Sequence, residues 1–196
     1  MIEIEKKFAL RPGDRERLIA GATFVATKKI SDTYYDTTDF ALTKKDWWLR
    51  FRNDRFELKM VIAGVGSVRQ RSIDQYCEFE TDQEIQQALG LVGNEPLRIL
   101  LEKNGYTPFT TIITTREKYT KGGFVIDLDV MDFGYEVIEI ELLVDAPEQV
   151  AEAEKKIMAF AASVGLSTDF IFGKVVEYLR RYRPAQFQVM VDVGLV

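Results

Sequence analysis

Apolar and charged residues alternate along several segments of the chain. At the N-terminus, Ile2 and Ile4 alternate with Glu3, Glu5 and Lys7. Side chains at alternate positions of a strand point to opposite faces, so this segment predicts a strand with one charged and one apolar face. The same alternation recurs at residues 50–52, 57–59, 78–80, 127–129 and 139–141. If several of these charged faces converge, the sheet surrounds a charged interior.

The hydrophobic periodicity of the rest of the chain predicts strands, then helices, then strands again, with helices at the end. Strands are predicted near residues 2–8, 23–36, 47–53, 55–62, 70–80, 109–119, 123–131 and 134–144. Helices are predicted near 15–20, 82–91, 95–103, 147–163 and 169–182, with a turn or short helix at 38–46 and a hairpin loop at 64–67.

These elements predict one α+β domain over residues 1–196, a closed or nearly closed antiparallel eight-stranded β-barrel with helices packed outside. Solvated charged faces are the competing interpretation, because antiparallel strands commonly face water on one side. Asp127 and Asp129 favour the charged interior instead. Asp is disfavoured in strands, and like charges two positions apart are costly unless a cation relieves them.

Composition excludes several classes of site. The formal net charge is −5, which argues against a surface that grips nucleic acid by counterion release. The chain has no histidine, so a histidine base, a Ser-His-Asp triad and a histidine-zinc site are excluded. No segment approaches the roughly 20 apolar residues of a membrane span. We therefore expect no nucleic-acid and no membrane partner, and a monomer.

Cys77 is the only cysteine, so no disulfide can form within the chain. The apolar parity of its strand predicts a packed thiol. The N-terminus carries acidic residues and no apolar run of signal-peptide length. These features favour a reducing, cytoplasmic setting.

The charged faces contain both carboxylates and cations. Carboxylate oxygens are the hard ligands that Mg²⁺ or Mn²⁺ prefers, and Arg binds phosphate oxygens through two parallel hydrogen bonds. The candidate metal-facing carboxylates are Glu3, Glu5, Asp127, Glu139 and Glu141, and the candidate phosphate-binding cations are Lys7, Arg50, Arg52, Lys59, Arg116 and Lys174. Together the two sets predict a cavity for a metal-chelated polyphosphate.

The first strand resembles a known family signature. Glu3-x-Glu5-x-Lys7 resembles the ExExK motif of the CYTH superfamily, also called triphosphate tunnel metalloenzymes. Further matching pieces follow in order: Asp32-Thr-Tyr-Tyr-Asp-Thr37, Trp48-Leu-Arg-Phe-Arg52, Glu57-Leu-Lys59, Glu78, Arg116, Asp127-Leu-Asp129, Asp132-Phe-Gly-Tyr135, Glu139-Ile-Glu141, Lys174 and Tyr178-Leu-Arg-Arg-Tyr-Arg-Pro184. The resemblance covers nearly the whole chain and is strongest to the animal thiamine-triphosphatase branch.

The resemblance implies an antiparallel eight-stranded tunnel and magnesium-dependent hydrolysis of thiamine triphosphate to thiamine diphosphate and phosphate. It implies that the five carboxylates face the metal, that the six cations hold the triphosphate, and that Glu139 also contacts the substrate. Lys174 lies on a predicted helix, so only the resemblance places it in the site. Trp48 shares its parity with Arg50 and Arg52, and the resemblance implies that its indole recognises thiamine.

Proton transfer has three candidate residues. Tyr34 and Lys59 are expected near the attacking water, since a desolvated lysine loses its proton more readily. The alternatives are that Lys59 only binds phosphate and that Tyr34 only packs. Glu78 either supports the metal ligands or reaches a second metal. Glu80, Asp129 and Lys118 share the charged parity, and for them a solvated position at the rim is an equal alternative.

Three functions remain open at the level of the sequence. The first is thiamine triphosphate hydrolysis. The second keeps the tunnel with inorganic tripolyphosphate or a nucleoside triphosphate as substrate, or with adenylate cyclisation as in class IV-like adenylate cyclases. The third is a non-catalytic polyphosphate-binding module, which the intact carboxylate and lysine sets disfavour.

Overall fold

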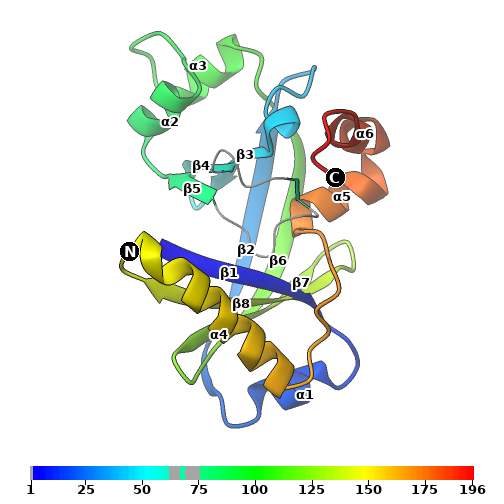
Figure 1. Ribbon diagram of the computed structural model, residues 1–196. Coiled ribbons are helices and arrows are strands. Elements are labelled where there is room, and N and C mark those ends of the chain that lie inside the picture. The colour runs from blue at the N-terminus through cyan, green and yellow to red at the C-terminus, as the bar shows by residue number, and fades with distance from the viewer. Residues whose placement is uncertain (1, 62–66, 69–75) are drawn as a thin grey trace. The chain divides into compact units, whose positions relative to one another are not determined.

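The computed structural model describes residues 2–61, 67–68 and 76–196. Most of the hairpin loop predicted at 64–67, and the start of the strand predicted at 70–80, lie outside these residues. The described part confirms eight strands, at positions close to those predicted (Figure 1). They are β1 (Ile2–Ala9), β2 (Thr23–Asp36), β3 (Trp47–Arg52), β4 (Arg55–Val61), β5 (Tyr76–Phe79), β6 (Thr107–Lys121), β7 (Phe124–Met131) and β8 (Glu136–Val144).

The eight strands form one sheet in the order β1-β8-β7-β6-β2-β3-β4-β5. The pairings of β1 with β8, β8 with β7, β7 with β6, β2 with β3, β3 with β4 and β4 with β5 are antiparallel, as predicted. The closed barrel was a wrong prediction, because β1 and β5 are the two edges of an open sheet. Closure requires the edge strands to pair along matched lengths, and within the described residues β5 has four residues against eight in β1.

The helices are α1 (Asp14–Ile19), α2 (Asp82–Ala88), α3 (Leu97–Lys103), α4 (Val150–Ser163), α5 (Lys174–Tyr182) and α6 (Pro184–Asp192), with 3₁₀ turns η1 (Thr43–Lys45) and η2 (Pro147–Gln149). The short helix expected at 38–46 is confirmed as η1. The helix expected from residue 169 begins at Lys174, and α6 was not predicted. Pro184 occupies the first turn of α6, where a missing backbone N–H costs nothing, so it starts a helix where the sequence suggested a stop.

The chain divides into two compact units. Unit 1 comprises Met1–Ile30, Val68–Gln75 and Thr114–Tyr178, and unit 2 comprises Ser31–Ser67, Tyr76–Ile113 and Leu179–Val196. Boundaries fall inside the long strands β2 and β6 and inside α5, so each of these elements contributes residues to both units.

The core of unit 1 lies between the sheet and α4, which runs across β1 and β8 (Figure 1). Ile4, Ile126 and Ile140 supply the sheet side, and all three are buried. Ile157 and Ala161 of α4 face them, one helical turn apart on the same face. The predicted apolar faces of β1, β7 and β8 are thus confirmed as core. The charged residues of these strands lie on the opposite face of the sheet.

Unit 2 has its own core under β3 and β4. Leu49 and Leu58 are fully buried against Ile85 of α2 and Leu100 of α3. Trp47 packs at the margin of this cluster, as predicted for the tryptophan on the apolar face. The apolar alternation of these strands is therefore confirmed too, and it leaves Trp48, Arg50, Arg52, Glu57 and Lys59 on the other face.

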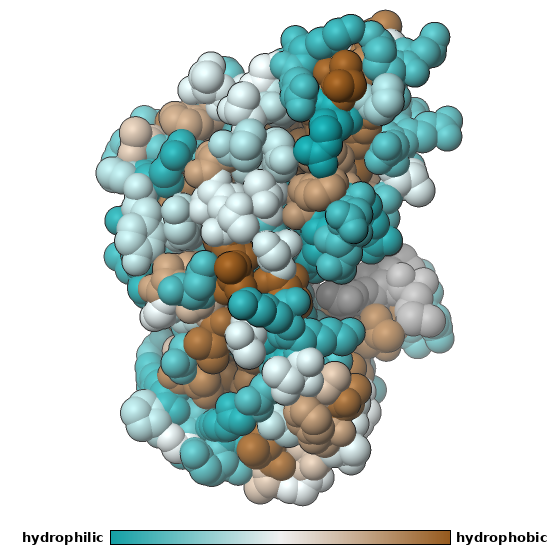
Figure 2. Space-filling model, turned by 180° about the vertical axis from the view of Figure 1, so that it is seen from behind, coloured by the Kyte–Doolittle hydropathy of each residue, from teal (hydrophilic) through white to brown (hydrophobic). Residues whose placement is uncertain are grey.

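The surface corrects one prediction, because the Cys77 thiol expected to pack is exposed. On the face shown in Figure 2, hydrophobic residues are interspersed with hydrophilic ones. Within the part of the chain that is described, no helix combines the length and apolar character needed to cross a membrane.

Candidate active site

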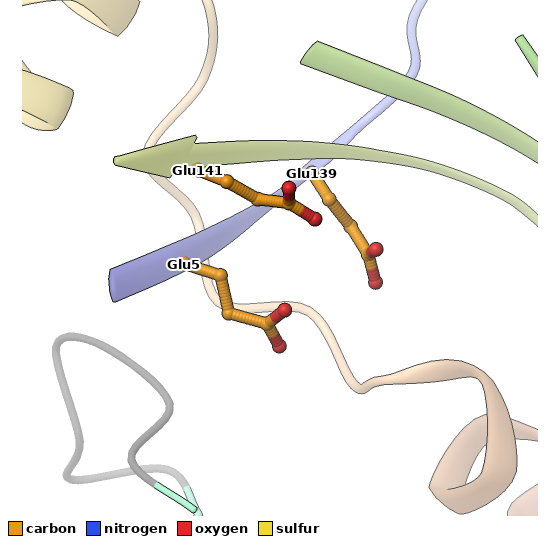
Figure 3. Close-up of side chains that lie close together, drawn as sticks. All are labelled: Glu5, Glu139 and Glu141. Atoms are coloured by element: carbon orange, nitrogen blue, oxygen red, sulfur yellow. The ribbon is translucent and has the colours of Figure 1, made fainter. Parts of the chain in front are cut away.

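Three carboxylates converge on the charged face of unit 1. Glu5 of β1 pairs in register with Glu141 of β8, and Glu139 lies two positions along the same face of β8. One oxygen from each carboxylate lies within 4.8 Å of the others, and Figure 3 shows the side chains reaching from the two strands toward shared space. Their side chains are only 11%, 12% and 12% exposed. Like charges this close repel one another, so the cluster favours a bound cation.

Lys7 lies beside this cluster, directly opposite Glu139 in the β1–β8 register. Its ammonium group pairs with the Glu5 carboxylate and lies 4.0 Å from Glu139 Oε1. The first strand therefore carries a carboxylate and a cation to the same site, as its alternation predicted. Glu3, the other predicted metal ligand of β1, lies opposite Leu143 in the register, and its side chain is outside the described part of the structure.

Arg116 of β6 binds three carboxylates. Its Nε and Nη2 each lie 2.6 Å from an oxygen of Asp129, its Nη1 lies 2.5 Å from Asp127 Oδ2, and Nη2 also donates to Glu139 Oε2 at 2.5 Å. Burial alone would lower the pKa of Arg116, but its hydrogen bond to Asp129 and the charge of Glu139 outweigh burial and raise that pKa. Arg116 is thus a permanent cation that holds two strands' carboxylates in place.

Two residues treated as possible rim residues lie inside this network. Asp129 is 0% exposed, so a solvated position for it is wrong. Lys118 pairs with Asp127 at 3.0 Å and lies 3.7 Å from Glu141 Oε2. Glu80, by contrast, is an exposed residue paired with Arg55 at 3.3 Å, consistent with the rim. The three residues differ in how deeply they are buried. The alternation of the sequence shows the face on which a residue lies but not its burial.

Asp127 carries a buried oxygen without a hydrogen-bond partner among the described residues. Its Oδ2 accepts from Arg116 and pairs with Lys118, whereas its Oδ1 has no partner. Burial raises the pKa of Asp127, and the charge of Arg116 offsets this only in part. Asp127 is the register partner of Glu139, so the orphaned oxygen belongs to a residue next to the glutamate cluster. The three glutamates supply hard oxygen donors that fit a divalent cation, and the unsatisfied oxygen of Asp127 lies on a residue adjacent to them in the register.

Lys174 reaches the same charged face from α5. Its Nζ lies 3.4 Å from the hydroxyl of Thr114, a buried residue of β6. Burial raises the pKa of Asp129, and the nearby charge of Lys174 acts against that rise. Lys174 is thus near Thr114 and Asp129, and its binding of triphosphate stays a prediction.

The charged face of unit 2 is organised around Arg50 and Arg52 of β3. Arg50 donates from Nε to Glu57 Oε2 at 2.8 Å. Arg52 grips Asp32 of β2 with two hydrogen bonds, at 2.5 and 2.7 Å. Burial by itself raises the pKa of Glu57, but the charge and hydrogen bond of Arg50 outweigh it and leave that pKa below its ordinary value.

Asp32 and Glu57 were not assigned roles from the sequence, although both stand in the matching motifs. Asp32 shares the parity of Tyr34, and Glu57 shares that of Lys59. Both are buried acids on the charged face. The only signal in the sequence was that both residues lie on the charged face of their strands. The sheet register was needed to show which cations they pair with.

Lys59 and Glu78 form an ion pair, a contact that the sequence did not predict. Lys59 Nζ is 2.5 Å from Glu78 Oε1, and the two residues are register partners on β4 and β5. Tyr34 is 2% exposed and pairs in register with Arg50, with its ring 6.2 Å from that of Phe109. Tyr34 is therefore packed on the same face as the arginines, with its ring held in place.

Trp48 is 6% exposed and is the register partner of Lys59. Its indole Nε1 donates to Asp46 Oδ1 at 2.9 Å, and the Tyr76 hydroxyl donates to the same carboxylate at 3.2 Å. Asp46 is buried and holds a left-handed backbone conformation with φ 56°. Sequence reasoning missed Asp46, whose signal was only its place in the turn before β3.

The described strands form a sheet with a charged face in each unit, which holds clustered carboxylates in unit 1 and cation–carboxylate pairs in unit 2. Residues 1–170 match the CYTH domain, and the chain belongs to that family.

Relatives and solved structures extend this finding. The chain is 30% identical to the thiamine-triphosphatase of Macaca fascicularis and 31% identical to that of Homo sapiens, each over 99% of this chain and 91% of the relative. Its fold is similar to PH1819 of Pyrococcus horikoshii OT3, with a TM-score of 0.64 at 22% identity over 91% of this chain and 98% of the other. It also resembles HpAC1 of Hippeastrum, a proposed adenylyl cyclase described as having a dominant triphosphatase activity, with a TM-score of 0.56 at 17% identity over 89% and 93% of the two chains.

Proposed function

We propose that the protein hydrolyses thiamine triphosphate to thiamine diphosphate and phosphate, with magnesium as its divalent cation. The observation that carries the proposal is the cluster of Glu5, Glu139 and Glu141, whose carboxylate oxygens lie within 4.8 Å of one another. It occurs in a chain 30–31% identical to two thiamine-triphosphatases over nearly its whole length.

The reaction breaks one phosphoric anhydride bond. A water oxygen forms a bond to the terminal phosphorus while the bond from that phosphorus to its bridging oxygen breaks. The electrons of the broken bond leave with the oxygen of thiamine diphosphate, and the water loses a proton. Charge spreads over the terminal phosphoryl oxygens, so fixed cations and correct positioning are the main contributions a protein can make.

The carboxylates of unit 1 would hold the metal. Glu5, Glu139 and Glu141 are the proposed ligands, with Glu3 and the orphaned oxygen of Asp127 as further donors. When bound there, magnesium supplies charge neutralisation at the phosphate oxygens. Manganese suits the same oxygen donors.

The cations would bind the triphosphate oxygens. Lys7, Arg116 and Lys174 serve this role in unit 1, and Arg50, Arg52 and Lys59 serve it in unit 2. Arg50, Arg52 and Arg116 are already oriented by carboxylates, so little reorganisation is needed when an anion arrives. In this proposal Glu139 serves both the metal and the triphosphate. It lies beside the phosphate-binding Lys7 and Arg116 as well as beside the other two glutamates.

The proton of the attacking water is assigned to the Lys59–Glu78 pair, with the Tyr34 hydroxyl as a further candidate on the same charged face. Support comes from the 2.5 Å ion pair of Lys59 Nζ and Glu78 Oε1, in which the Glu78 carboxylate is a proton acceptor and the Lys59 ammonium group holds it in place. The alternative is that Lys59 only binds phosphate and Tyr34 only packs. A normal pH profile of kcat in Glu78→Gln would favour that alternative.

Trp48 would recognise the organic part of the substrate. A cationic thiazolium ring is attracted to an indole face, and Asp46 holds the Trp48 indole by its N–H. Replacing Trp48 with Ala should lower kcat/KM for thiamine triphosphate about tenfold, since a desolvated cation–π contact is worth about 1–2 kcal/mol. Tripolyphosphate has no ring, so its kcat/KM should change less than twofold. Equal losses on both substrates would remove the thiamine assignment.

Phosphate release from a substrate panel tests the proposal directly. The panel contains thiamine triphosphate, inorganic tripolyphosphate and ATP, each with magnesium or with a chelator. Thiamine triphosphate should have the highest kcat/KM, and the chelator should abolish release. A protein that binds tripolyphosphate with magnesium but releases no phosphate over long incubation would instead be a polyphosphate-binding module.

A second candidate function is hydrolysis of tripolyphosphate or a nucleoside triphosphate, or cyclisation of ATP. It is favoured by the fact that every proposed contact except Trp48 recognises only phosphates. Equal turnover across the panel would support the broader triphosphatase, and cyclic AMP formed from ATP would support the cyclase.

A further inference from the structure

The turn between β7 and β8 carries a motif that the proposed chemistry does not use. Asp132-Phe133-Gly134-Tyr135 connects the two strands, and the backbone N–H of Met131 donates to the Tyr135 carbonyl at 2.9 Å. Gly134 has φ 73°, a conformation that glycine adopts without strain. The turn is therefore tightly closed, and the aromatic side chains on it have a fixed base.

Tyr135 reaches from this turn to a distant part of unit 1. Its hydroxyl donates a 2.6 Å hydrogen bond to the carbonyl of Phe172, two residues before Lys174. Residues 166–173 belong to no helix or strand, so the backbone ladders that hold regular elements do not hold this segment. The Tyr135 bond is thus an anchor for the chain that leads into α5.

A second contact grips α5 on the other side of Lys174. The Phe133 ring stacks on Tyr135, with centroids 6.0 Å apart, and meets Tyr178 edge to face at 5.5 Å. Tyr178 follows Lys174 by one helical turn. The same turn between β7 and β8 therefore holds the chain both before and after Lys174.

The group held in this way lies on the charged face. Lys174 is the first residue of α5, and its Nζ lies 3.4 Å from Thr114 Oγ1. A lysine side chain has a limited length, so the position of its backbone sets which points its charge can reach. A shift of the segment before α5 would move the ammonium group away from the site.

We propose that Tyr135 is a positioning residue for Lys174, and that its hydroxyl holds the start of α5 so that Lys174 reaches the terminal phosphates. This inference rests on the proposed function, since it assigns Lys174 to triphosphate binding. In this proposal Tyr135 acts only through Lys174 and is assigned no contact with the metal or the substrate.

The test compares two Tyr→Phe variants that each remove one hydrogen-bonded hydroxyl. Y135F loses the bond to Phe172, and Y119F loses a 2.8 Å bond to Glu117 on the opposite face of β6. Y135F should raise the KM for thiamine triphosphate about fivefold, the factor expected from one lost hydrogen bond, with kcat changed less than twofold. Y119F should leave both constants near those of the wild type. An unchanged KM in Y135F, or equal effects in the two variants, would overturn the proposal.

A double variant separates positioning from a general structural role. If Tyr135 acts through Lys174, Y135F added to K174A should raise KM no further than K174A alone. Multiplying effects would overturn the proposal. Hydrogen exchange of residues 166–178 should be faster in Y135F and unchanged in Y119F, and exchange unchanged in Y135F would also contradict it.

A binding experiment separates the positioning role of Tyr135 from the proposed hydrolysis. Calorimetric titration of tripolyphosphate with magnesium repeats the comparison without turnover, and Y135F should bind about fivefold more weakly. Absence of hydrolysis by the wild type would then defeat the proposed function alone. Equal affinity in Y135F and the wild type would defeat the positioning role whether or not hydrolysis occurs.

Discussion

The charged faces of units 1 and 2 use the same residue types, but they balance charge differently. In unit 2 each cation has a nearby acid, with Arg50 on Glu57, Arg52 on Asp32 and Lys59 on Glu78. In unit 1 three glutamates crowd together, and one arginine serves three carboxylates.

The pKa values follow this difference. Arg50 overcomes burial and lowers the pKa of Glu57, whereas burial prevails over Arg116 and raises the pKa of Asp127. A surplus of buried acid needs a cation from outside the chain, and matched pairs do not. The contrast supports our proposals that the metal binds in unit 1 and that the oriented cations of unit 2 bind an anion.

The largest effect is expected from Glu139→Gln. Removing one charge from the glutamate cluster should lower kcat/KM for thiamine triphosphate at least about 100-fold, by loss of metal affinity and of the contact to Arg116. Phosphate release at increasing magnesium concentration measures the effect, and high magnesium should restore part of it. Glu80→Gln is the matched control, since Glu80 is exposed and lies outside the cluster. Near-normal kcat/KM in E139Q would break the assignment of the metal to unit 1.

Glu57→Gln should instead act on stability. At pH 7 the change should lower the free energy of unfolding by about 2 kcal/mol, because a buried charged hydrogen bond to Arg50 is lost. The pKa of Glu57 is lowered from 4.5, so its ionised form stabilises the fold above pH 4.5, and this stabilisation is lost as pH falls through the folded pKa.

Urea unfolding at pH 7 and at pH 3.5 tests this pH dependence. The difference between wild type and E57Q should shrink at the lower pH. E139Q without magnesium should be destabilised less than E57Q, since losing one glutamate charge also relieves repulsion in unit 1. Equal destabilisation of the two variants would contradict the contrast between the faces.

The smallest effect is expected from substitutions at Gly173, which test whether the position of Lys7 in unit 1 matters for substrate binding. A Cβ at Gly173 would lie 3.5 Å from Lys7 Cε, an ordinary contact, so Gly173→Ala should behave like the wild type. Gly173→Val adds methyl groups that must displace the lysine, and the KM for triphosphate should rise about threefold while stability changes little. Steady-state kinetics on the two variants measures the difference. A similar KM for both would mean that Lys7 adapts and that its packing is unimportant.

Much of the sheet could be predicted because a strand repeats every two residues. Ile4 and Glu5 were assigned to opposite faces from their neighbours alone, and the structure confirms that Ile4 is buried in the core and that Glu5 lies with Glu139 and Glu141 on the other face. Helix ends were harder, since Pro184 fits either the end of one helix or the first turn of the next. The exposed Cys77 shows that a parity argument weakens in a strand of four residues.

For the individual site residues, the sequence indicated which residues matter but not which residues pair with each other. The family pattern named Arg116 and Lys174, but it did not show that Arg116 binds Asp129 or that Asp46 holds Trp48. Those pairings depend on the register between strands and on the path of a turn. Neither quantity is recorded in the spacing of residues along one strand.

The sequence by itself determined which side chains share a face, because that property depends only on neighbouring residues. It also carried the ordered motifs that indicated the family. Only the tertiary structure decided that Glu5 lies opposite Glu141, and that Tyr135 anchors the segment before Lys174 from 37 residues away. Such contacts join residues that are distant along the chain, and they arise only when the strands are in register and the core has packed.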